Sequence, residues 1–135
     1  MSALDKLDAL ESFQSRRASL YTSFISSWGK VLATRRSDPR KVPQELTQQL
    51  TGFYLQTSMI GSDLVVKKLN EFQEISRVAM RTKDMMPVLA AFGGVCLEMR
   101  KELNPATKLT AEDILRTFIV DLDTQPQLLE LLRKQ

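Results

Sequence analysis

The chain has 135 residues, 43% of them hydrophobic and 26% charged, with a net charge of +3. This length predicts one compact domain, and five glycines and five prolines are too few for a turn-dense β-sandwich. Because the chain has no histidine, it lacks the usual general base near neutral pH and the commonest metal ligand, which excludes most hydrolase templates.

The N-terminal sequence MSALDKLDALESF carries three acids and has neither the basic nor the apolar region of a signal peptide. The longest uncharged stretch, from Met85 to Leu97, is shorter than the ~20 residues that a membrane-spanning helix needs. We therefore expect a soluble, cytoplasmic protein with no transmembrane segment. The single Cys96 fits a small buried side chain in a reducing compartment, and a reactive thiol is the alternative.

The first predicted element is a long helix over residues 4–36. This stretch has no proline, and its apolar residues recur at alternating three- and four-residue spacing, with acids near its start and bases near its end. One row contains Ala18, Tyr21, Ile25, Trp28 and Leu32, and a second row beside it contains Leu10, Phe13, Leu20, Phe24 and Val31. Four residues of the first row, Tyr21, Ile25, Trp28 and Leu32, form a candidate partner interface, through which the chain would self-associate as a homo-oligomer.

The next segment, RRSDPRK, breaks the helix and is the densest basic patch of the chain. Its candidate anion contacts are Arg35, Arg36, Arg40 and Lys41. It has no aromatic residue for base stacking and no glycine-rich loop for phosphate, so a solvated loop is the favoured interpretation. The alternative function is an adaptor that binds nucleic acid or an anionic membrane surface through these four side chains.

Two further helices are predicted over residues 44–60 and 62–81, separated by Gly61 and capped by Ser62. A DNA-reading helix-turn-helix needs an apolar residue where this sequence has Lys67, and the surrounding helix face has mixed charge. The pattern therefore favours a corner in a packed bundle over DNA recognition.

The remaining predicted helices cover residues 84–103, about 110–122 and 126–134. Pro87 is acceptable in a first helical turn, and Thr110 with Asp113 forms a variant of the capping box. The apolar stripe of the middle helix contains Ile114, Leu115, Phe118, Ile119 and Leu122. Gly93 and Gly94 lie together inside a helix, which predicts close packing by another part of the chain, with a groove for a ligand or partner helix as the alternative.

Asp121 and Asp123 lie at a predicted helix C-terminus, where acids oppose the helix dipole. We expect them to form structural ion pairs with Arg100 or Lys101. A metal site is the disfavoured alternative, because two acids without further oxygen ligands bind Mg²⁺ or Ca²⁺ poorly. No metal or cofactor is expected.

Several stretches together resemble a family of uncharacterised bacterial helical domains whose members read like GSDEVIKAFNEF, RKDLG and DILRLFINDID. The matching residues are Gly61-Ser62-Asp63, Val65-Val66-Lys67, Asn70-Glu71-Phe72, Phe92-Gly93, Met99-Arg100-Lys101-Glu102-Leu103, Leu109, Asp113-Ile114-Leu115-Arg116, Phe118-Ile119 and Asp121-Leu122-Asp123. The resemblance covers about residues 53–123, with Glu102 and Asn104 in place of aspartate and glycine. It implies an all-helical fold and a bacterial origin, and it implies no activity.

These observations predict an all-α helical bundle of about five helices, with a long helix in residues 1–36 packed on a core formed by residues 44–135 as one domain. The predicted function is a non-catalytic interaction or accessory domain, not an enzyme. Its expected partner is a protein, either a second copy of the chain or another one.

Overall fold

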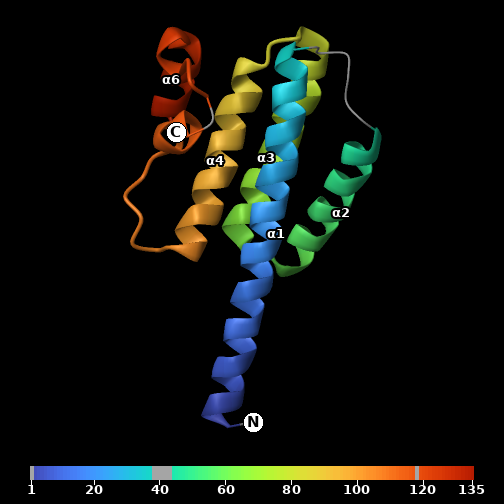
Figure 1. Ribbon diagram of the computed structural model, residues 1–135, viewed down its shortest axis with the longest axis vertical. Coiled ribbons are helices and arrows are strands. Elements are labelled where there is room, and N and C mark those ends of the chain that lie inside the picture. Colours follow the sequence, from blue (N-terminus) through green and yellow to red (C-terminus); the bar gives the residue numbers. More distant parts are fainter. Residues whose placement is uncertain (1, 38–43, 118) are drawn as a thin grey trace. The chain divides into compact units, whose positions relative to one another are not determined.

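The computed structural model describes residues 2–37, 44–117 and 119–135, and it describes no side chains for residues 32–37 and 44–47. In these residues all regular structure is helical and there is no strand, which confirms the predicted all-α class with a long N-terminal helix (Figure 1). The elements are α1 (Ala3–Ser37), α2 (Gln44–Ile60), α3 (Asp63–Thr82), α4 (Met86–Leu103), α5 (Ala111–Arg116), the 3-10 turn η1 (Leu122–Thr124) and α6 (Pro126–Arg133).

The chain divides into two compact units, residues 1–61 and residues 62–135. The first unit contains α1 and α2, and the second contains the remaining elements. The expectation that both form one domain stays a prediction.

In the first unit, α1 and α2 form an antiparallel hairpin. The Trp28 indole N–H donates to the Tyr54 hydroxyl at 3.0 Å, and the Phe24 and Tyr54 rings meet edge to face at 5.8 Å. Farther back along α1, the Arg17 side chain donates to the carbonyl of Ile60, the last residue of α2. The two helices therefore run in opposite directions.

In the second unit, α3 begins as predicted with Ser62, whose hydroxyl accepts from the Val65 amide at 3.3 Å. Its buried face packs against α4, where the Phe72 and Phe92 rings lie 6.0 Å apart. The buried residues of α3 are Val65, Leu69, Phe72 and Ala79. Helix α4 starts at Met86, two residues later than predicted, and the carboxylate of Asp84, which precedes the helix, accepts the Met86 amide at 3.1 Å.

The fifth helix is shorter than predicted. The capping box of Thr110 and Asp113 is present, but α5 ends at Arg116 and not near Leu122. The Thr117 hydroxyl donates back to the Ile114 carbonyl at 2.7 Å. The buried Ile119 lies in irregular backbone after α5, and the buried Leu122 lies in η1. Ile119 and Leu122 therefore keep the spacing of a helix and are buried, although they lie beyond the end of α5.

Candidate functional site

The most exposed part of the described chain is the N-terminal part of α1. Every residue from 3 to 16, hereafter the exposed segment, is solvent-exposed, whereas residues 17–31, hereafter the covered segment, include a buried face. Large apolar side chains are nevertheless present in the exposed segment: Leu4 is 72% exposed, Leu7 54%, Leu10 60% and Phe13 36%. Figure 1 shows this part of α1, in blue, extending past the end of α2.

The length of α2 explains why the exposed segment has no cover from its own hairpin. At 1.5 Å per residue, the 35 residues of α1 span about 50 Å and the 17 residues of α2 about 25 Å. Since α2 ends beside Arg17, the hairpin has no second helix for the residues that precede it. The apolar spacing did not predict this exposure, although the unequal lengths of the two predicted helices were a usable signal.

The helical conformation of the exposed segment is locally specified at its start. The Ser2 hydroxyl accepts from the Asp5 amide at 3.1 Å, and the Asp5 carboxylate accepts from the Ser2 amide at 3.2 Å. This reciprocal pair is a capping box, which satisfies two of the amides left open at a helix start. The segment is therefore a capped continuation of α1.

The apolar residues of the exposed segment follow the same seven-residue repeat as the buried face. Leu10 precedes Arg17, Phe24 and Val31 in this repeat, and Leu7 precedes Gln14, Tyr21 and Trp28. A seven-residue repeat drifts by only ~20° per repeat on a straight helix. Leu7 and Leu10 thus continue the core-facing side of α1 beyond the point where its core ends.

Arg17 marks the junction between the two segments. Its guanidinium carbon lies 4.3 Å from the centre of the Phe13 ring, and its Nε donates to the Ile60 carbonyl. The first contact is a cation–π interaction, and the second satisfies a carbonyl that the end of α2 leaves without a helical partner. One arginine therefore covers part of Phe13 and anchors the end of α2.

The predicted partner interface lies in the covered segment. Tyr21 is fully buried and Trp28 is 6% exposed, so neither is open to a second chain in this structure. Ile25 is half-buried, and the side chain of Leu32 lies outside the described residues. Among the described side chains of α1, the large apolar ones that face solvent are those of the exposed segment.

The candidate anion contacts fall where the structure describes no side chains. Arg35 and Arg36 belong to the helical backbone of α1, and Arg40 and Lys41 lie outside the described residues. Binding of nucleic acid or anionic membrane through these residues stays a prediction.

The glycine pair of α4 meets side chains of the same unit. A Cβ atom on Gly93 would lie 3.2 Å from Leu115 Cγ and from Leu132 Cδ2, and a Cβ on Gly94 would lie 2.9 Å from Gln135 Oε1. The Gln135 amide also donates to the Ala90 carbonyl at 2.8 Å. Close packing by Leu115 and Leu132 accounts for Gly93, whereas Gly94 meets only the flexible end of Gln135. A groove of about 230 Å³ lies beside Gly94 between α3, α4 and α6.

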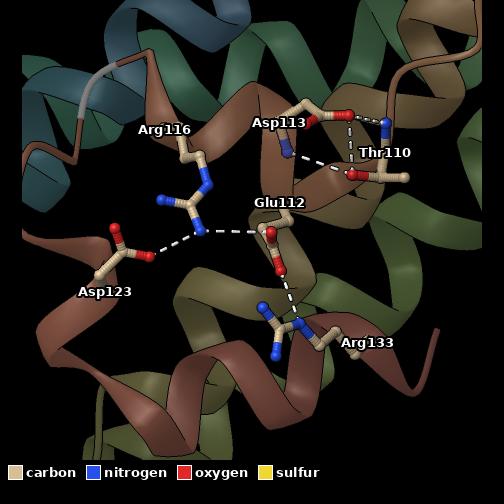
Figure 2. A network of polar contacts seen from close by, with 6 residues as sticks. All are labelled: Thr110, Glu112, Asp113, Arg116, Asp123 and Arg133. Carbon is tan, nitrogen blue, oxygen red and sulfur yellow. Dashed lines mark hydrogen bonds and ion pairs between the residues drawn. The ribbon is translucent and has the colours of Figure 1, made fainter.

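A polar network joins α5 to η1 and α6 (Figure 2). Arg116 lies between Glu112 at 3.3 Å and Asp123 at 2.7 Å, and Glu112 also accepts from Arg133 Nε at 2.8 Å. The hydrogen bond from Arg133 lowers the pKa of Glu112, and the hydrogen bond from Arg116 lowers the pKa of Asp123. The network holds its carboxylates ionised and paired, which suits a structural role.

The expected ion pair of Asp123 has a different partner, and the pairing of Asp121 with Arg100 or Lys101 stays a prediction. Asp123 pairs with Arg116 and not with the predicted Arg100 or Lys101. Arg100 donates to the Thr107 hydroxyl at 2.9 Å, and Lys101 lies 3.5 Å from Glu98. Because α5 ends early and η1 turns back, Arg116 of α5 lies closer to Asp123 than helix spacing would place it.

Three further findings concern the thiol of Cys96, metal binding and membrane spans. Cys96 is 2% exposed, and burial raises the pKa of its thiol to about 12, so the thiol is protonated at neutral pH. Within residues 2–37, 44–117 and 119–135, no three acidic or cysteine side chains gather as a metal site would require. Nor does any helix in the described part of the chain combine the length and apolar character needed to cross a membrane.

No protein-family model, curated protein or solved structure matches this chain. The resemblance to uncharacterised bacterial helical domains stays a prediction.

Proposed function

We propose that this protein is a non-catalytic helical interaction module that binds a protein partner through the exposed segment of α1. The single observation that carries this proposal is the exposure of Leu7 and Leu10 on the helix side that is buried farther along α1. Apolar residues that continue the buried face of a helix into its exposed part are typical of a surface that binds another helix.

The alternative explanation for these leucines is scattered surface hydrophobicity, which is common and has no functional meaning. Three features argue against it: the leucines share a repeat with the core, they lie on a capped helix, and they are accompanied by Leu4 and Phe13. Apolar residues grouped on one exposed element are typical of an interaction site.

The test is affinity capture from the native host with a matched pair of variants. In the first variant Leu7→Lys and Leu10→Lys remove the apolar row, and in the second Ser12→Lys and Ser15→Lys add the same charge to exposed residues elsewhere on the segment. We expect the wild type and the serine variant to retain the same protein, identified by mass spectrometry, and the leucine variant to lose it.

Since all four positions are exposed, both variants should keep the wild-type helix content and melting temperature. Capture of the same proteins by all three forms, or of none by the wild type, would contradict the proposal. Self-association counts as binding in this test only if the leucine variant loses it.

A further inference from the structure

We draw no further inference here: the strongest candidate, the exposed apolar face of α1 around Leu7 and Leu10, belongs to the site already described, and nothing in the structure shows what covers it.

Discussion

The two segments of α1 have related sequences and different surroundings. Both follow one seven-residue repeat, but Tyr21, Phe24 and Val31 are at most 1% exposed while Leu7 and Leu10 are more than half exposed. Sequence pattern therefore specified which side of the helix is apolar, and the length of α2 decided how much of that side its own hairpin covers. The exposed segment is where this arrangement leaves room for a partner.

The largest expected effect is the difference in free energy of unfolding between a substitution in the covered segment and one in the exposed segment. Phe24→Ala should lower the free energy of unfolding by about 3–5 kcal/mol, because it removes a fully buried ring that packs on Tyr54. Leu10→Ala should change it by less than about 0.5 kcal/mol, since Leu10 is mostly exposed. Urea unfolding of the dilute monomer measures both, and similar losses would contradict the division of α1.

The C-terminal end of α2, which packs against α1, can be destabilised by a substitution at Gly61. A Cβ atom on Gly61 would lie 2.6 Å from the Thr57 carbonyl oxygen, so Gly61→Ala should cost about 1–3 kcal/mol. Gly52 is the matched control, because a Cβ there meets nothing within 4 Å and alanine is the better helix former. Gly52→Ala should raise the free energy of unfolding by roughly 0.5–1 kcal/mol; destabilisation by both changes would refute this account of Gly61.

The polar contact inside the hairpin gives a smaller effect. Trp28→Phe removes the indole N–H that donates to the Tyr54 hydroxyl. The expected loss is about 1 kcal/mol, a typical net value for a hydrogen bond, together with some lost packing. Thermal unfolding followed by circular dichroism checks it, and an unchanged melting temperature would show that this bond does not stabilise the hairpin.

The smallest stability effect belongs to the start of the exposed segment. Ser2→Ala removes the hydroxyl that accepts the Asp5 amide, and should reduce helix content near the N-terminus with a change in global stability below about 0.5 kcal/mol. Chemical shifts of the first turns measure the loss of helix. A large drop in global stability would mean that the exposed segment contributes to the core.

The sequence predicted most helix boundaries, because they depend on local signals. The α2 boundaries at Gln44 and Ile60 agree with prediction, and the caps at Ser62 and Thr110 are present. The end of α5 was mispredicted because Leu115, Ile119 and Leu122 keep helical spacing in an irregular path. The partner of Asp123 was missed for the same reason, since its pairing with Arg116 depends on that path.

The sequence predicted which side of α1 is apolar, but it did not predict which part of that side is exposed. Amphipathic spacing placed Leu10 and Phe13 on the same side as Phe24, but periodicity carries no information on where the covering helix stops. Burial depends on both helices of the hairpin, and the contact between Arg17 and Ile60 shows where α2 ends along α1.

The most direct test of the central claim is amide hydrogen exchange along α1 in the purified protein. We expect residues 20–31 to exchange slowly, because they include the buried face of α1, and residues 5–16 to exchange faster, because all of them are exposed. Exchange in residues 5–16 that is as slow as in residues 20–31 would contradict the division of α1 into a covered and an exposed segment.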